Sequence, residues 1–286
     1  MNRTEMANTA FRRAVEIRKS AKIGRTDPLN VFDIAMNHLG LRVQFLAGSS
    51  FEGMFAKEQK TILVPSERPH GRRAFAAAHE IGHWAFDHGS QIDLTDSFED
   101  YNAKPEEQIV NLFGGYLLMF PASVEVGAAE VGLNFKLPTA QKIYELACWL
   151  GVGYTTLINH LQRTLFKISS TDADALRHVE LKNIRKIFSP DFPTRHLVVT
   201  SSFKPRMPID IQVGDHVIVP QGAISSNDCL TFVSSNQHGQ IFGAVNPGIS
   251  LLQGSTDWAA AIRVMTREFT GWAKYRHLEN DNDEND

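Results

Sequence analysis

The residues of this chain that could do chemistry together lie in its first third, where His79 and His83 enclose Glu80 in the pattern His-Glu-x-x-His. Side chains four positions apart on a helix leave the same face, so both imidazoles can reach one zinc ion. Glu80 lies beside them, where its carboxylate can accept a proton from an attacking water. The same pattern also arises by chance in core helices, so it indicates a metal site without establishing one.

The third ligand has to come from elsewhere, because a catalytic zinc takes three protein ligands and leaves one position open. One known pattern continues with Gly and then His at three-residue steps after the second His, but Phe86 and Gly89 occupy those positions here. The other common solution is a Glu on a second helix. Residues 105–119 are predicted to form such a helix, with Pro105 at its first position.

Two adjacent glutamates, Glu106 and Glu107, open this second helix. Both could merely complement the positive end of the helix. However, Glu107 shares a face with Asn111 four residues on, and a ligand with a hydrogen-bonding amide one turn away is a sensible pair. The predicted site therefore has zinc ligands His79, His83 and Glu107, the catalytic base Glu80, and Asn111 as a supporting residue behind the ligands.

A longer series of motifs surrounds these residues, from residue 27 to residue 121 and more weakly to about 162. In order, it comprises Asp27-Pro28, Ile34-Ala35, residues 39–43, 51–54 and 61–64, Arg73 and Phe75, residues 78–83, and Glu107-x-x-x-Asn111-x-Phe113 running into residues 117–119. This series resembles the ImmA/IrrE zinc metallopeptidases. The departures from the family pattern, at Ala76, Ala77 and Phe120, touch no ligand. The resemblance implies zinc ligands at His79, His83 and Glu107, and the catalytic glutamate at Glu80.

The resemblance also implies an activity, a zinc-dependent endopeptidase that hydrolyses a peptide bond in a partner protein. The implied partner is a helix-turn-helix transcriptional repressor, whose cleavage switches on stress, DNA-damage or phage-related genes. Single-stranded DNA is one candidate activator. The alternative is a DNA-binding or sensing transcriptional regulator that keeps the zinc for structure. Structural zinc sites are normally closed by four protein ligands, and the three found here favour catalysis.

The composition of the chain is compatible with a peptidase. The chain has 286 residues, 43% of them apolar and 21% charged, and a net charge of −3, which gives no overall nucleic-acid signal. Cys148 and Cys229 are too few for a disulfide framework and suit a reducing cytosol. A thiolate from either could also occupy the open zinc position and inhibit the enzyme. No transmembrane stretch or signal peptide is evident, so we expect a cytoplasmic protein without membrane contact.

The elements that must position the site are a small antiparallel sheet and two active-site helices, as in zincin-like peptidases. Strands are predicted at residues 41–46, 53–57 and 61–64, with residues 51–57 as the edge that a peptide substrate would join, and helices at 29–39 and 72–88. The basic segment 1–25 is either a nucleic-acid arm or an amphipathic helix leaning on the domain. We favour the helix.

Several further residues are predicted to lie near the site. His88 points away from the metal-facing side of His83 and is predicted to be a structural or supporting histidine. Residues 91–104 are polar and are predicted to form a loop over the mouth of the active site. Tyr101 and Tyr116 could stabilise an oxyanion, but a structural role is favoured for each.

The second third of the chain contains two apolar helices around Gly151, within residues 138–163, and these resemble a helix-turn-helix. Read literally, it would contact DNA through Thr155, Thr156, Asn159 and Arg163. Little positive charge lies nearby for phosphates, so we favour a helical hairpin packed on the peptidase core. One further helix is predicted at residues 173–187.

From residue 195 the pattern changes to short strands, predicted at 196–200, 215–219, 230–233 and 240–244, followed by an amphipathic helix over residues 258–277. The predicted fold class is therefore α+β. The predicted divisions are a zincin-like metallopeptidase domain (1–124), a helix-turn-helix-like segment with a linker (125–190), a β-rich regulatory module (191–277) and a disordered acidic tail (278–286).

Overall fold

The structure is a computed structural model, and it describes residues 2–89, 91–93, 104–190, 196–254 and 257–278. Its described residues combine helices with three mixed sheets, which confirms the α+β class. The helices are α1 (Arg3–Ser20), α2 (Val31–Asn37), α3 (His70–Ala85), α4 (Pro105–Leu118), α5 (Pro121–Val131), α6 (Ala140–Leu150), α7 (Tyr154–Arg163), α8 (Ser170–Arg177), α9 (Leu181–Phe188) and the 3-10 helix η2 (Ala273–Tyr275). The strands are β1 (Arg42–Leu46), β2 (Gly53–Ala56), β3 (Thr61–Pro65), β4 (Gln91–Asp93), β5 (Leu197–Val199), β6 (Ile209–Gln212), β7 (His216–Val219), β8 (Ile224–Ser225), β9 (Leu230–Asn236), β10 (Gly239–Ala244), β11 (Gly248–Gln253), β12 (Ala259–Met265) and β13 (Gly271–Trp272).

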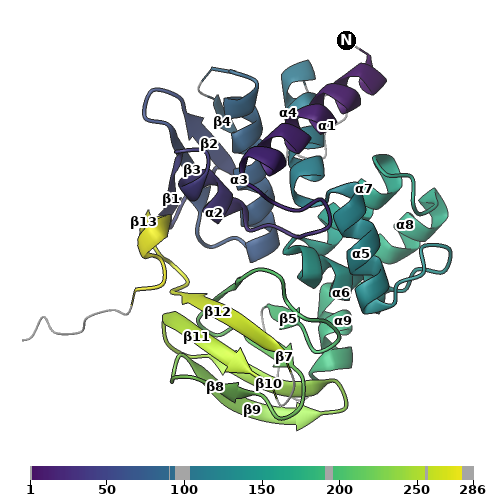
Figure 1. Ribbon diagram of the computed structural model, residues 1–286, viewed down its shortest axis with the longest axis vertical. Coiled ribbons are helices and arrows are strands. Elements are labelled where there is room, and N and C mark those ends of the chain that lie inside the picture. The colour runs from purple at the N-terminus through teal and green to yellow at the C-terminus, as the bar shows by residue number, and fades with distance from the viewer. Residues whose placement is uncertain (1, 90, 94–103, 191–195, 255–256, 279–286) are drawn as a thin grey trace, which may run out of the picture.

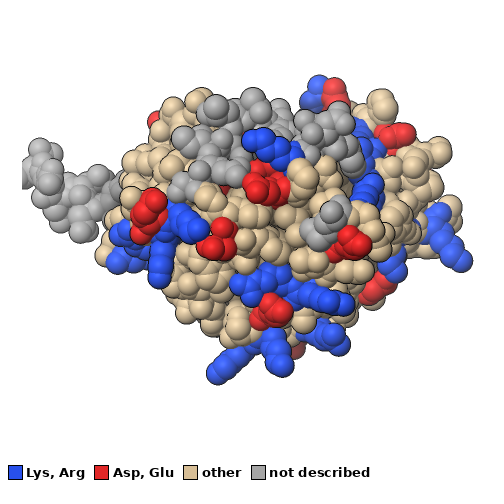
Figure 2. Space-filling model, turned by 90° about the horizontal axis from the view of Figure 1, so that it is seen from above, with Lys and Arg blue, Asp and Glu red and all other residues tan. Residues whose placement is uncertain are grey.

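The basic N-terminal segment forms α1, which begins with a capping box between Asn2 and Glu5 and packs along α4. Arg18 is buried, and its guanidinium donates to the backbone oxygens of Leu117 at 2.9 Å and Gly24 at 2.8 Å. This arrangement agrees with a helix leaning on the domain. Figure 2 views this end of the molecule, where the Lys and Arg side chains lie in separate groups, most of them beside an Asp or Glu.

The sheet next to α3 has the strand order β13-β1-β3-β2-β4. It is mixed, because β1 and β3 run parallel while the other pairs are antiparallel, so the predicted antiparallel sheet is wrong in that detail. The predicted substrate edge is also wrong. Strand β2 is internal, since the chain returns after α3 as β4 and pairs with it, Met54 opposite Ile92. A three-residue strand such as β4 leaves too short a pattern to be predicted.

Helices α5 to α9 share one continuous hydrophobic core with the N-terminal part, which joins Phe113 of α4 to Leu146 and Leu157. Gly151 ends α6 in a left-handed conformation, with φ of 69°, and the chain turns there into α7. The single helix predicted at 173–187 is two helices, α8 and α9. Among the described residues no single helix is long and apolar enough to cross a membrane, and only the bent pair α4 and α5 meets that test when taken together.

The β-rich part consists of two four-stranded sheets, β5-β7-β10-β9 and β6-β12-β11-β8, whose inner side chains form a second core. The helix predicted at 258–277 is wrong, because this stretch forms β12, β13 and η2. Its buried residues Ala260, Ile262 and Val264 alternate along the chain, which is the period of a strand.

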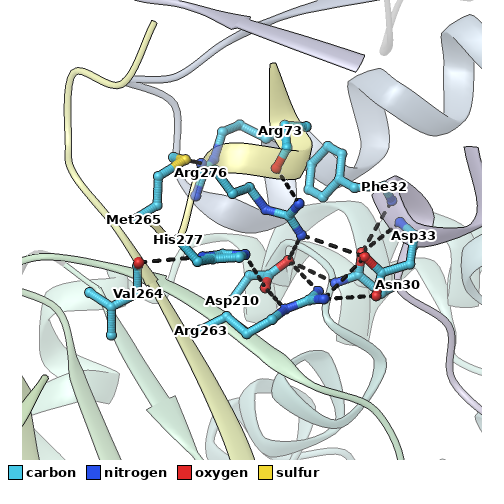
Figure 3. Close-up of polar contacts among 11 residues, drawn as sticks. Asn30, Phe32, Asp33, Arg73, Asp210, Arg263, Val264, Met265, Arg276 and His277 are labelled. Atoms are coloured by element: carbon cyan, nitrogen blue, oxygen red, sulfur yellow. Dashed lines mark hydrogen bonds and ion pairs between the residues drawn. The ribbon is translucent and has the colours of Figure 1, made fainter. Parts of the chain in front are cut away.

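A strand pairing and a buried polar cluster are among the contacts that join the β-rich part to the N-terminal part. After β12 the chain leaves the two lower sheets, and strand β13 pairs with β1, with Gln44 opposite Trp272 (Figure 1). Nearby, Asp210 accepts hydrogen bonds from Arg263, Arg276 and Asn30 (Figure 3). Arg263 also reaches Asp33 of α2 at 2.9 Å. We call these five residues the Asp210 cluster; they connect β6, β12 and the C-terminal segment to the start of α2.

Candidate metal centre

Helix α3 carries the three motif residues into the interior of the protein. His79 and His83 are completely buried, and Glu80 is 1% exposed. The helix packs on one side against β2 and β3 and on the other against α4. Its alanine-rich surface allows this close packing on both sides, which leaves the polar motif residues between the sheet and α4.

Three ligating atoms converge between α3 and α4. His79 Nε2 and His83 Nε2 are 3.0 Å apart, and Glu107 Oε2 lies 3.2 Å from the first and 3.6 Å from the second. Among the described residues this is the group of His, Cys, Asp and Glu side chains placed to hold a metal ion. A tetrahedral zinc with bonds of about 2.0–2.1 Å separates its ligand atoms by about 3.3 Å. The observed distances bracket that value, so the residues fit such an ion.

The supporting residues fix which ring nitrogens face the centre. Asn111 Oδ1 lies 2.9 Å from His79 Nδ1 and can only accept, so this nitrogen carries the hydrogen and Nε2 keeps its lone pair. His83 Nδ1 lies 3.1 Å from His88 Nδ1. His88 thus stands behind His83 and orients its ring, in agreement with the supporting role predicted from its position on the helix.

Glu107 completes the centre as a carboxylate. Burial opposes its ionisation, but the two neighbouring imidazoles outweigh burial and hold the pKa of Glu107 below its ordinary range. Its Oε2 is buried and has no hydrogen bond of good geometry within the described chain. Glu106 is exposed and does not belong to the group. A carboxylate oxygen and two imidazole nitrogens are electron-pair donors, and a bound cation would satisfy all three.

Glu80 lies against the sheet, at Gly53 on β2. A Cβ atom at position 53 would lie 2.6 Å from Glu80 Oε1, so any larger residue would displace the carboxylate. The Glu80 side chain is therefore held between α3 and the backbone of β2. Our sequence analysis missed this role of Gly53. The available signal was a glycine inside a strand, which often marks a close approach.

Other side chains considered from the sequence lie away from the centre. Tyr116 packs against Phe11 and His160, with ring centroids 5.3 and 5.6 Å apart, and burial raises its pKa. Tyr101 and most of the predicted loop lie outside the described residues. Burial raises the pKa of Cys148 to about 12, and Cys229 is buried in the second core. Neither thiol belongs to the ligating group, which contradicts the inhibitory-thiolate hypothesis.

Comparison with known proteins finds a family similar to this part of the chain. Residues 36–148 match the Peptidase_M78 family model, the IrrE N-terminal-like domain, and this stretch contains α3 and α4. The match confirms the resemblance to the ImmA/IrrE family over that part of the chain. No curated protein matches. A solved Mycobacterium tuberculosis transcriptional regulator is similar at 18% identity with a TM-score of 0.36, covering 56% of this chain and 48% of that one, a likeness too weak to define a shared fold. The chain thus spans about half the length of that protein.

Proposed function

We propose that this protein is a zinc-dependent endopeptidase with a zincin-like catalytic domain. The observation that supports the proposal best is the convergence of the ligating atoms of His79, His83 and Glu107. Glu80 lies on α3 between the two histidines. A structural zinc is normally closed by a fourth protein ligand. The group found among the described residues has three, which supports catalysis over the alternative, a DNA-binding or sensing regulator with a structural zinc.

Each residue of the centre has a role in this proposal. A zinc ion held by the three ligands would polarise the scissile carbonyl and make water more acidic. Glu80 takes a proton from the attacking water and passes it to the leaving amine nitrogen. Gly53 keeps the Glu80 carboxylate in position, and Asn111 and His88 keep the two imidazoles oriented.

The family resemblance supports a specific kind of substrate and setting. We propose that a helix-turn-helix repressor in the cytoplasm is cleaved, and that its loss derepresses stress, DNA-damage or phage-related genes. Residues 191–277 would serve as a regulatory module that selects the partner or senses a signal. Single-stranded DNA is one candidate signal.

The decisive experiment compares the zinc-loaded wild type with Glu80→Gln, using a repressor encoded beside this gene as substrate. Glutamine is nearly isosteric with glutamate and cannot act as a base, so cleavage should fall at least about 100-fold. Zinc content and melting temperature should stay at wild-type values. Intact mass analysis of the repressor measures the cut. Equal cleavage by both proteins would exclude the catalytic role of Glu80, and adding single-stranded DNA to both reactions tests the proposed signal.

A further inference from the structure

A large cavity lies between parts of the chain that are distant in sequence. Its volume is about 780 Å³, and it is lined by residues of α3, α4, α6, α7, α9 and β6. Cavities of about 300–1,000 Å³ are typical of small-molecule sites. His79, Glu80, His83 and Glu107 do not line it, but Asn111, which holds the ring of His79, does. An occupant would therefore contact the support of the metal centre without touching the reacting atoms.

The α7 side chains that could have contacted DNA face this cavity. Thr155, Thr156, Asn159 and Arg163 all line it. The start of α3 lies directly against the turn before α7, where a Cβ on Gly71 would be 2.3 Å from the backbone nitrogen of Gly153. Helix α3 thus occupies the space in front of this turn. The arrangement favours a ligand between the helices over a DNA groove.

The charged side chains that line the cavity are mostly cationic. Four arginines line it, together with a single carboxylate among the described residues, that of Asp210, which already binds Arg263 and Arg276. The lining arginines are Arg3, Arg72, Arg163 and Arg185. Arg72 is paired with Glu52 at 2.8 Å, and Arg185 on α9 is half-buried in the cavity wall.

Two helix ends and an apolar wall add to this character. Helices α3 and α7 both begin at the cavity, and neither has a side-chain cap on its first N–H groups. The N–H groups at the start of a helix attract anions, and this attraction adds to that of nearby positive side chains. Between the charged groups the wall is apolar, formed by residues that include Phe75, Leu112 and Met207. The cavity thus combines sites for a negative group with a surface for an apolar body.

We propose that this cavity binds a small organic anion, with an apolar body and a carboxylate or phosphate group, as an effector of the protein. Its occupant would contact the metal-binding helices, α7 and the β-rich part at once. A ligand shifts an equilibrium toward the form that it binds better. Binding would therefore favour the arrangement in which these three parts are held together, and it would reach the metal centre through Asn111.

The test uses 1-anilinonaphthalene-8-sulfonate, an aromatic anion, as the probe and the full-length zinc-loaded protein. We expect saturable binding of one probe per chain, measured by fluorescence titration and calorimetry. Arg185→Glu should weaken it about tenfold or more, because one charge-assisted contact becomes a repulsion. The matched control is Lys186→Glu, which makes the same charge change on the exposed neighbour outside the cavity and should bind as wild type does. Thr156→Trp should block binding by filling the space.

The result that overturns the proposal is equal binding by wild type, Arg185→Glu and Thr156→Trp, or equal weakening by the Lys186→Glu control. Melting curves ensure that the compared variants are folded. Competition then distinguishes the two sources of negative charge: displacement of the probe by adenosine 5′-monophosphate indicates a phosphate ester, and displacement by octanoate indicates a carboxylic acid. Displacement by neither at millimolar concentration contradicts the assignment to organic anions.

Discussion

The metal centre and the Asp210 cluster are both buried groups of ionisable side chains, but they differ in how their charges are balanced. The Asp210 cluster contains its own cations: Arg263 and Arg276 meet the carboxylates of Asp210 and Asp33. The metal centre brings together two imidazole nitrogens and a carboxylate oxygen at 3.0–3.6 Å, with Glu80 on the same helix. One cluster contains both its anions and its cations, and the other offers three donor atoms placed to hold a metal ion.

This difference separates a structural role from a functional one. Removing one member of a complete buried ion pair leaves a charge without its partner, so the cost falls on stability. Removing a ligand of an incomplete cluster abolishes ion binding, so the cost falls on metal content and activity. The predictions below test that separation, beginning with the largest expected effect.

Glu107→Ala should reduce bound zinc from about one ion per chain to a background level, because two imidazoles alone hold zinc weakly. Metal analysis of the purified protein measures this, and a chelator should lower the melting temperature of the wild type but not that of the variant. Glu106→Ala is the matched control on the neighbouring residue, and it should retain zinc. Retention by Glu107→Ala with loss by Glu106→Ala would move the third ligand to Glu106.

Asp210→Asn should destabilise the protein by about 3–5 kcal/mol at pH 7 while leaving zinc binding intact, because two guanidiniums lose a buried partner. Burial opposes the ionisation of Asp210, but Arg276 and Arg263 outweigh it and hold its pKa well below the ordinary value. Because folding lowers the pKa of Asp210, its ionised carboxylate stabilises the fold fully at pH values above the unfolded pKa of about 3.9. This contribution decreases gradually as the pH falls from about 3.9 toward the pKa of the folded state.

The pH series supplies the check on this prediction. The unfolding free energies of wild type and variant should differ most at neutral pH, and the difference should begin to shrink below about pH 4 and keep shrinking as the pH falls further. Asp257→Asn, which removes the carboxylate of the exposed Lys204 ion pair, serves as control and should leave stability unchanged. A constant difference across the whole pH range would show that Asp210 does not act through its charge.

Gly53→Ala should lower kcat/KM by about 100-fold, because the added methyl group displaces the Glu80 carboxylate and small misplacements of catalytic groups are costly. Zinc content should not change. The control is Gly89→Ala near the site, where an added methyl group meets open space. Full activity in Gly53→Ala would mean that Glu80 does not need its observed position.

His88→Ala should weaken zinc binding by about 10- to 100-fold, since the ring of His83 loses its orienting partner. Competition with a chromogenic chelator measures the affinity. His88→Gln, which can still accept a hydrogen bond, should restore part of the loss, whereas His38→Ala at the exposed end of α2 should have no effect. A loss that glutamine does not restore would assign His88 a packing role instead.

The sequence predicted the metal centre better than the surrounding architecture because its signals are local. His79, Glu80 and His83 lie within one helix, and the spacing of Glu107 and Asn111 is also that of a helix. The first three strands are short, largely apolar runs separated by turn residues. Pairing direction has no comparable signal, so the parallel β1–β3 pair and the short β4 were not foreseen.

The Asp210 cluster shows why the rest could not be predicted. Its charged residues come from α2, β6, β12 and the segment after η2, and nothing within any one segment indicates which distant charge it will meet. The stretch at β12 had a weak alternation among alanines, and composition favoured a helix there. These contacts depend on tertiary structure, which local propensity does not encode.

The pairing of β13 with β1 also has a consequence for synthesis. A ribosome delivers the chain from its N-terminus, so β1 to β4 and the centre on α3 emerge while residues 271–272 are still to be made. Until then the outer side of β1 has no neighbour, and the guanidinium of Arg276 has not reached Asp210. The sheet beside the metal-binding helices is therefore finished only after the β-rich part of the chain has been translated.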